Sequence, residues 1–442
     1  MKKLENTIDQ KTSYIKTSSY EARNGEIDKV LLLYSGGLDT SVMLKWIQDN
    51  YHARVVTLTM NLGQQHDDLK AIEKKAIKFG AVKTYTLDVR EEFAAEYIAK
   101  GIKANAHYQG EYHLSTPIGR AILAKKAVEI AQKEGIKCIA HGCTGKGNDQ
   151  VRIDGYILVL DKNMKIIAPV REWGMDREEE IRYAEQNQIP VPATIDFPYS
   201  DDDNMWGITW EGGEITDPKL IVPTENFLTT YTLPKNGPDK AELVTLSFEK
   251  GIPIALNGKK LPLFELIINL NKIAGKHGVG TVQLLEDRLV GLKNRGVYEH
   301  PAAHVIIEAH RNLEKYVSTR QLNELKGTMD TKWGYMCYGA LWFDQAMEAI
   351  NAFNDSVNER VDGEVTIRLF KGNTEVVAIT SPYALSFTSF NNSEGYKFNV
   401  NNSAGFTEIY TLQMRLAKEI DDKKIKNDEK IMGQKRGKRN LR

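Results

Sequence analysis

A polar loop at residues 35–41 reads Ser-Gly-Gly-Leu-Asp-Thr-Ser and follows an apolar stretch of strand length. Its two glycines let the backbone turn tightly and expose successive N–H groups, and three hydroxyls stand beside them. A helix that starts here would add the positive end of its dipole, so the loop could cradle phosphate oxygens. The alternative is an ordinary strand-to-helix turn capped by Asp39 or Thr40. The density of polar groups favours the phosphate site.

A second polar loop, at residues 141–152, also follows a short apolar stretch. Three glycines permit a ligand to approach closely, and Thr144, Asn148, Asp149 and Arg152 supply donors, acceptors and both charges. In an open parallel sheet, ligands bind outside the carboxyl ends of the strands. The two loops are therefore expected to face one crevice, although a surface loop with Asn-Asp turn chemistry is the alternative.

The elements that carry these loops alternate between strand and helix. Continuous apolar runs alternate with amphipathic stretches such as residues 118–133, which is typical of a parallel sheet covered on both faces. We therefore predict an α/β nucleotide-binding domain over residues 28–193. The predicted strands are residues 29–34, 54–62, 83–89, 137–141 and 165–170.

The pattern changes near residue 190, where the chain becomes rich in Asp, Gly and Trp and shows little periodicity up to about residue 222. A separate α+β domain is predicted over residues 194–405. Its strand pairs are 243–248 with 252–256, followed by an Asn257-Gly258 turn, and 364–370 with 375–380, joined through Gly372-Asn373. Its predicted helices are 263–274, 302–317 and 333–357.

Both ends of the chain differ from the middle. Residues 1–27 are polar and predict a mobile N-terminal extension. Residues 406–442 predict a C-terminal helix with a basic tail, because Phe406, Ile409, Leu412, Leu416 and Ile420 recur at helical spacing. That apolar stripe needs a surface to pack on, either its own domain or a neighbouring subunit.

The bulk composition excludes several classes of protein. Lys+Arg and Asp+Glu both number 59, which argues against a general nucleic-acid binder, because that class normally has an excess of basic residues. The three cysteines have no disulfide or metal spacing, and no apolar run reaches membrane-spanning length. We expect a soluble cytoplasmic protein with no membrane contact.

The first loop lacks the Gly-Lys-Ser/Thr of a Walker loop and the third glycine of a Rossmann fingerprint. It resembles the pyrophosphate loop (PP-loop) of the ATP pyrophosphatases, which cleave ATP between the α and β phosphates. The second loop, His-Gly-x-Thr-Gly-Lys-Gly-Asn-Asp-Gln-Val-Arg, is similar to a hallmark of the argininosuccinate synthase family. Collinear matches follow at residues 198–207 with Glu211, 274–280, 286–288 and 293–299.

The resemblance implies a PP-loop domain of the adenine-nucleotide α-hydrolase type, an α+β synthetase domain and a C-terminal oligomerisation helix. It implies a ligase that joins citrulline and aspartate with ATP in arginine biosynthesis, giving argininosuccinate, AMP and pyrophosphate through a citrullyl-adenylate. It also implies a homotetramer, and a Mg²⁺ ion that arrives with ATP and takes no ligand from the protein.

The resemblance assigns three sets of contacts. The ATP contacts are Leu33, Tyr34, Ser35, Gly36, Gly37, Leu38, Asp39, Thr40, Ser41, Met60 and Gly142. The citrulline contacts are Tyr112, Thr116, Asn148, Arg152, Ser200, Thr209, Glu211, Glu286 and Tyr298. The aspartate contacts are Thr144, Asn148 and Asp149. Asp149 is the candidate general base, although it could instead only orient the amine of aspartate. Citrulline is a zwitterion, and Glu286 and Arg152 supply the two charges that such a ligand needs.

Some positions depart from the family. Pro117 stands where many members have a serine that touches citrulline, so Ser115 or Thr116 would have to serve instead. Met60 and Cys143 stand where alanine is common. Three other interpretations stay open: another adenylating enzyme of the same loop class, a silent nucleotide-binding or RNA-binding scaffold, and a relative that acts on a citrulline analogue. Neither a sulfur-relay cysteine pair nor a glutaminase domain supports the first.

Overall fold

The computed structural model describes residues 14–65, 68–175, 177–190, 198–386, 399 and 401–439, without the side chains of residues 177 and 433–439. The chain divides into two compact units, one that ends at Ala384 and one that begins at Leu385. The first unit contains all three sheets of the described chain, and the second contains two helices.

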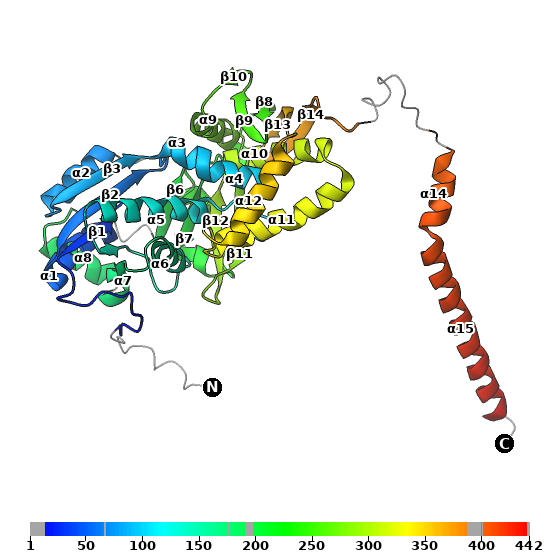
Figure 1. Ribbon diagram of the computed structural model, residues 1–442, viewed down its shortest axis with the longest axis horizontal. Helices are drawn as coiled ribbons and strands as arrows, with labels where there is room; N and C mark the ends of the chain where they lie inside the picture. The colour runs from blue at the N-terminus through cyan, green and yellow to red at the C-terminus, as the bar shows by residue number, and fades with distance from the viewer. Residues whose placement is uncertain are drawn as a thin grey trace. The chain divides into compact units, whose positions relative to one another are not determined.

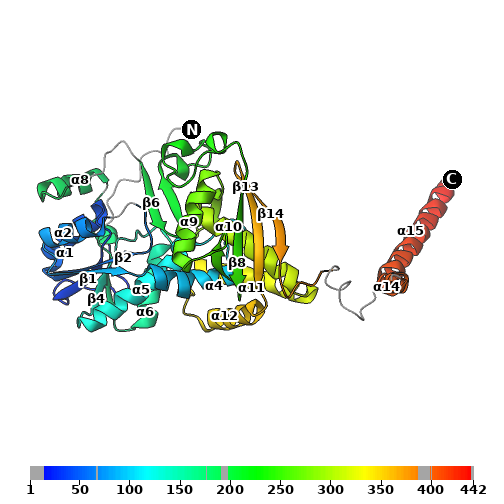
Figure 2. The same ribbon diagram turned by 90° about the horizontal axis from the view of Figure 1, so that it is seen from above.

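The first sheet is parallel, with strand order β3-β2-β1-β4-β5. It lies between α1, α2 and α8 on one side and α5 and α6 on the other (Figure 2). Both faces are buried, because Val30 and Leu32 pack in the cluster of α1, whereas Leu31 packs in the cluster of α5. The strands are β1 (Lys29–Leu33), β2 (Arg54–Asn61), β3 (Lys83–Asp88), β4 (Cys138–Ala140) and β5 (Lys165–Ile167).

The helices of this half connect those strands and cover them. The longer helices bury the apolar faces that the sequence predicts. Their bounds are α1 (Leu38–Tyr51), α2 (Leu69–Lys78), α3 (Arg90–Glu92), the π-helix η1 (Phe93–Ile98), α4 (Ala99–Lys103), α5 (Ser115–Lys133), α6 (Asp149–Leu160), α7 (Pro169–Glu172) and α8 (Arg177–Gln186). The predicted parallel α/β architecture is confirmed.

Residues 14–27 lie against the edge of the first sheet beside β5. The Ala22 N–H donates to the Ile166 carbonyl at 3.0 Å, and the Ile166 N–H donates to the Tyr20 carbonyl at 2.9 Å. Ala22 is fully buried, and Lys16 forms an ion pair with Glu172 at 3.0 Å. The prediction of a mobile extension is therefore wrong for residues 14–27, because backbone pairing with a strand edge needs no apolar sequence pattern. Residues 1–13 lie outside the described residues.

The second sheet is antiparallel, with order β10-β9-β8-β13-β14. The Asn257-Gly258 turn has the positive φ values, 49° and 76°, that its sequence predicts. The last hairpin turns one residue earlier than predicted, through Lys371 and Gly372, so that Asn373 begins β14. The strands are β8 (Glu242–Glu249), β9 (Ile252–Leu256), β10 (Lys259–Lys260), β13 (Gly363–Phe370) and β14 (Asn373–Thr380).

A third sheet, antiparallel with order β11-β12-β7-β6, was not predicted from the sequence. Its strands are polar because one of its faces borders a cavity rather than the core, as described below. The strands are β6 (Tyr199–Asn204), β7 (Gly207–Gly212), β11 (Thr281–Asp287) and β12 (Lys293–Glu299), and the 3₁₀ turns η2 (Gly213–Thr216), η3 (Thr224–Asn226) and η4 (Pro234–Asn236) follow β7.

The helices of the second half are α9 (Leu263–Lys276), α10 (Pro301–Val317), α11 (Arg320–Tyr338) and α12 (Gln345–Asn358). A single helix over residues 333–357 was predicted, and this is wrong, since the chain breaks between α11 and α12. Ala340 adopts a left-handed conformation with φ 63°, and the Asp344 carboxylate accepts the Ala346 N–H at 2.8 Å as a new helix cap. The apolar spacing continues across the break, which is why periodicity alone missed it.

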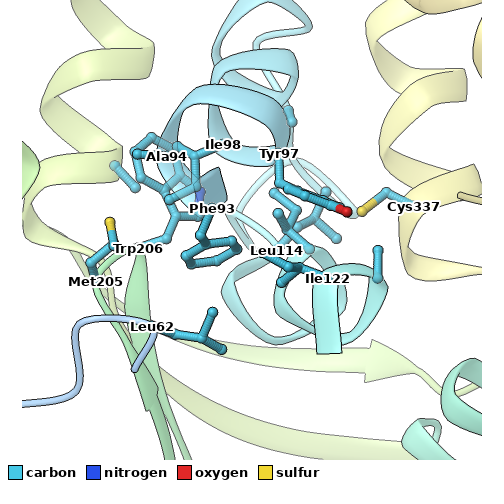
Figure 3. Packing of buried hydrophobic residues seen from close by; sticks show 14 of the residues in the cluster. Leu62, Phe93, Ala94, Tyr97, Ile98, Leu114, Ile122, Met205, Trp206 and Cys337 are labelled. Carbon is cyan, nitrogen blue, oxygen red and sulfur yellow. The ribbon is translucent and has the colours of Figure 1, made fainter. Parts of the chain in front are cut away.

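One hydrophobic cluster joins the two halves of the first unit. Phe93 and Ile98 of η1, Ile122 of α5, Trp206 and Cys337 of α11 all belong to it (Figure 3). The hydrophobic core is therefore shared by the parallel sheet and the second half. The predicted boundary at residue 193 falls among residues 191–197, which are not described, and stays a prediction.

The second unit contains α14 (Asn402–Tyr410) and α15 (Leu412–Arg439), which Figure 1 shows at the C-terminal end of the chain. Large apolar side chains stay exposed along them: Phe406 is 65% exposed, Ile409 77% and Ile420 65%. Among the described residues, no helix is both long enough and apolar enough to cross a membrane.

Candidate active site

One face of the third sheet carries side chains that the sequence motifs singled out. In the strand register, Ser200 lies opposite Glu211, and Thr209 lies opposite Tyr298. Glu286 shares this face, because it is four residues from Val282, which pairs with Tyr298. Side chains alternate between the two faces of a strand, so every second residue reaches the same side. The sheet therefore presents hydroxyls and carboxylates together.

The opposite face of the same sheet is apolar. Ile208, Trp210 and Val297 pack there with Phe227 in a cluster of their own. The strands thus alternate between a polar and an apolar face, and short strands interrupted by glycines hid this alternation at the sequence level. This arrangement anchors the sheet and leaves its polar face open.

A cavity of about 510 Å³ lies between the carboxyl ends of the parallel strands and this polar face. Most predicted site residues line it: Leu33, Tyr34, Ser35, Thr40, Met60, Tyr112, Thr116, Gly142, Thr144, Asn148, Asp149, Arg152, Ser200, Thr209, Glu211, Glu286 and Tyr298. The predicted residues outside the lining are Gly36, Gly37, Leu38, Asp39 and Ser41. The two loops predicted to share one crevice do so.

The glycine loop is organised by its own hydroxyls. The Gly36 N–H donates to Thr40 Oγ1 at 3.1 Å, and Ser41 Oγ donates to the Gly37 carbonyl at 2.6 Å. Gly36 has φ 81°, and a Cβ there would lie 2.8 Å from Ile72 Cγ1. Glycine is therefore required at residue 36 for both its backbone conformation and its space.

Two tyrosines and two threonines line one side of the cavity. The Tyr112 and Tyr298 rings stack with centroids 4.3 Å apart. The Thr116 N–H donates to the Tyr112 hydroxyl at 3.1 Å, and Thr116 Oγ1 lies 3.0 Å from Thr209 Oγ1. Of the two alternatives to the serine replaced by Pro117, Thr116 lines the cavity, whereas Ser115 is buried with its hydroxyl 3.5 Å from His300 Nε2.

Asp149 lies between two arginines. Its Oδ2 accepts from Arg120 Nε at 2.9 Å, and its Oδ1 accepts from Arg152 Nη1 at 2.7 Å. Burial alone would raise the pKa of Asp149, but the charges of Arg120 and Arg152 lower this pKa to about 2. A carboxylate with so low a pKa is a weak proton acceptor at neutral pH. The geometry favours an orienting role over a general base.

Two buried polar atoms of opposite charge have no hydrogen-bond partner among the described residues. Arg152 is 3% exposed, donates from Nε to the Tyr338 carbonyl at 3.0 Å and leaves Nη2 open. Glu286 is 4% exposed and leaves Oε2 open, and burial raises the pKa of Glu286. Buried polar groups are normally satisfied, and both residues line the cavity, so these two atoms are candidates for contact with a ligand that carries both charges.

The cavity lining also contains residues that the sequence reasoning did not assign, and Arg120, Asp202, Arg288 and Tyr338 are among them. Arg120 also pairs with Asp202, and Arg288 Nη2 donates to Glu211 at 2.9 Å. Arg120 could have been found, because it lies one helical turn after Thr116 on α5. Tyr338 carries no local signal, since only the fold brings the end of α11 to this loop, where its hydroxyl accepts from Asn148 Nδ2 at 2.7 Å.

Comparisons with known proteins agree with this architecture. A profile described as "Arginosuccinate synthase N-terminal HUP domain" matches residues 29–190, and one described as "Arginosuccinate synthase C-terminal domain" matches residues 199–417. The chain belongs to the argininosuccinate synthase family. An argininosuccinate synthase of Pyrococcus furiosus is 47% identical over 390 residues, which cover 88% of this chain and 94% of the relative. That of Symbiobacterium thermophilum is 45% identical over 389 residues, covering 88% and 97%.

Family membership confirms the resemblance read from the motifs, and with it the fold class. The argininosuccinate synthase of Brevibacillus brevis, 42% identical over 398 residues, covers 89% of this chain and 94% of its own. The N-terminal family domain corresponds to the parallel sheet and its helices, and the C-terminal one to the antiparallel sheets and the last helices. The roles of individual residues in the cavity stay predictions.

Proposed function

We propose that this chain is an ATP-dependent carbon–nitrogen ligase that condenses citrulline and aspartate to argininosuccinate, with release of AMP and pyrophosphate, in arginine biosynthesis. The proposal rests on two buried side-chain atoms that have no hydrogen-bond partner among the described residues, Arg152 Nη2 and Glu286 Oε2. Both residues line the same cavity as the glycine loop. A zwitterionic amino acid satisfies both buried atoms, with its carboxylate on the arginine and its ammonium on the glutamate.

The chemistry proceeds in two displacements. The ureido oxygen of citrulline attacks the α-phosphorus of ATP, the bond to the bridging oxygen breaks, and pyrophosphate leaves with the electron pair. The amine of aspartate then attacks the activated carbon, the carbon–oxygen bond to AMP breaks, and the nitrogen loses a proton. The covalent intermediate lies on the substrate, so the protein needs no nucleophile of its own.

The residues divide this work by position. Leu33–Ser41, Met60 and Gly142 hold ATP. Tyr112, Thr116, Asn148, Arg152, Ser200, Thr209, Glu211, Glu286 and Tyr298 hold citrulline. Thr144, Asn148 and Asp149 hold aspartate. Asp149, fixed by Arg120 and Arg152, aligns the attacking amine rather than accepting its proton.

Mg²⁺ arrives with ATP in this proposal. The described residues contain no group of three His, Cys, Asp or Glu side chains placed to hold a metal ion. The carboxylates of Asp149, Asp202 and Glu211 in the cavity are paired with arginines. Phosphate oxygens and water therefore suit the ion better than the protein does, and its charge would offset that of the phosphates.

The assembly is proposed to be a homotetramer in the cytoplasm, with no membrane or nucleic-acid partner. The exposed apolar side chains of α14 and α15, such as Phe406 and Ile409, need a covering surface, and a second copy of the chain would provide it. The alternative substrate, a citrulline analogue, has no structural support from Pro117, because Thr116 places a hydroxyl in the cavity instead.

Pyrophosphate release from ATP tests the proposal, with citrulline and aspartate omitted in turn. We expect release to depend on citrulline, and argininosuccinate to form only when aspartate is also present. Glu286→Gln should raise the KM for citrulline more than the KM for ATP. Absence of pyrophosphate release with all three substrates would overturn the proposal in favour of a nucleotide-binding scaffold.

A further inference from the structure

Helix α2 packs directly on the glycine loop. Ile72 fills the space beside Gly36, where an added Cβ would lie 2.8 Å from its Cγ1. Three residues further along the same face, Lys75 Nζ donates to the Gly36 carbonyl at 2.7 Å. Lys75 is half-buried, and burial lowers the pKa of its ammonium. Of the described side chains, it is the one lysine or arginine with a hydrogen bond to the backbone of residues 35–41.

This contact fixes the peptide between Gly36 and Gly37. In a trans peptide, the carbonyl oxygen of one residue and the N–H of the next point in opposite directions. Glycine at φ 81° can turn such a peptide either way at little cost. The ammonium of Lys75 holds the Gly36 carbonyl toward α2, so the Gly37 N–H is directed away from the helix.

The positive charge of Lys75 is not neutralised by a carboxylate of the described residues. The basic side chains in the cavity lining, Arg120, Arg152 and Arg288, are each paired with a carboxylate. No described carboxylate forms an ion pair with Lys75, and burial is the one cause that shifts its pKa. Departing pyrophosphate carries several negative charges, and a fixed cation next to its loop would stabilise them.

We infer that Lys75 is a positioning residue of the pyrophosphate loop: it fixes the Gly36–Gly37 peptide for phosphate binding and offsets the charge of the pyrophosphate. The inference rests on the proposed function for its turnover assay, but binding of ATP and of inorganic pyrophosphate tests it independently. Neither the motif nor the cavity lining includes this lysine, because it acts from behind the loop.

The test compares Lys75→Met with Lys74→Met on the full-length protein. Lys74 is exposed on the same helix, so both variants lose one positive charge from α2. For Lys75→Met we expect kcat/KM for ATP to fall about 10- to 100-fold, the cost of losing a charged hydrogen bond. Binding of inorganic pyrophosphate, measured by calorimetry, should weaken in parallel. The KM for citrulline should stay within about twofold.

Lys75→Arg should restore most of the loss, since it keeps the charge and a donor. Lys74→Met should match the wild type throughout. The inference is overturned if Lys75→Met binds ATP and pyrophosphate as Lys74→Met does, or if it loses citrulline and ATP affinity equally together with thermal stability. If the wild type proves inactive, the calorimetric comparison still decides the role of Lys75, while the proposed function fails separately.

Discussion

Gly296 is the position where one added methyl group should most directly disturb the cavity. It lies on β12, two residues from Tyr298 and on the same face. A Cβ at residue 296 would lie 2.4 Å from the Tyr298 hydroxyl oxygen and 2.6 Å from its Cζ. The backbone of Gly296 lies outside the left-handed region, so alanine is sterically acceptable except for this ring. In Gly296→Ala, the Tyr298 ring must therefore move.

The expected magnitude follows from what the ring contacts. Tyr298 is 1% exposed and stacks on Tyr112 at 4.3 Å. An aromatic pair contributes about 0.5–1.5 kcal/mol beyond the area it buries. Losing this pair should lower the free energy of unfolding by about that amount, and the displaced ring, which lines the proposed citrulline site, should raise the KM for citrulline. Overpacking should also lower the free energy of unfolding by about 1–3 kcal/mol.

The measurement is the KM for citrulline at saturating ATP and aspartate, together with urea unfolding. Gly327→Ala is the matched control, because an added Cβ there meets no atom within 4 Å on the exposed side of α11. The control should stabilise the helix by up to about 1 kcal/mol and leave the KM unchanged. A folded Gly296→Ala variant with wild-type KM for citrulline and wild-type stability would refute the steric reasoning.

Three further outcomes are expected. Asp149→Asn should keep citrulline affinity within a few-fold but slow turnover, and unchanged turnover in a stopped assay would remove Asp149 from the mechanism. Burial, opposed by Lys326 and reinforced by Glu314, raises the pKa of Asp330 to about 6. This pKa is above the value in the unfolded chain, so the folded state favours the protonated carboxyl of Asp330. The resulting contribution to the free energy of unfolding is complete below about pH 4 and is lost as the pH rises through about 6. In Asp330→Asn, the loss of unfolding free energy between pH 5 and 7 should shrink by about 1 kcal/mol in urea titrations. A chain that ends at Gly405 should show a lower mass by light scattering, and retention of the full oligomer mass would contradict docking through α14 and α15.

Local patterns predicted the elements that are buried on both faces. The strands of the parallel sheet were found within a few residues, because continuous apolar runs of this length, bounded by turn residues, are typical of buried strands. The Asn257-Gly258 turn was found because positive φ selects those two residues. The third sheet was missed, since its polar face borders a cavity and removes the apolar signal that periodicity detects.

Site residues in the two glycine-containing loops could be read from the sequence, because phosphate and substrate binding need dense polar groups on short, sharply turned segments. Sequence alone thus determined the reaction class, the two loops and the residue types that a zwitterionic substrate needs. It could not supply Arg120, Tyr338 or Lys75, which reach the loops from other elements.

The tertiary structure decided the remaining properties of the site. It pairs Asp149 with two arginines and lowers the pKa of Asp149, and it leaves one buried atom of Arg152 and one of Glu286 without a hydrogen-bond partner among the described residues. It also places Lys75 on the Gly36 carbonyl. The charge state of a side chain and the satisfaction of its hydrogen bonds depend on distances between segments far apart in the chain. Those distances are set only when the core packs.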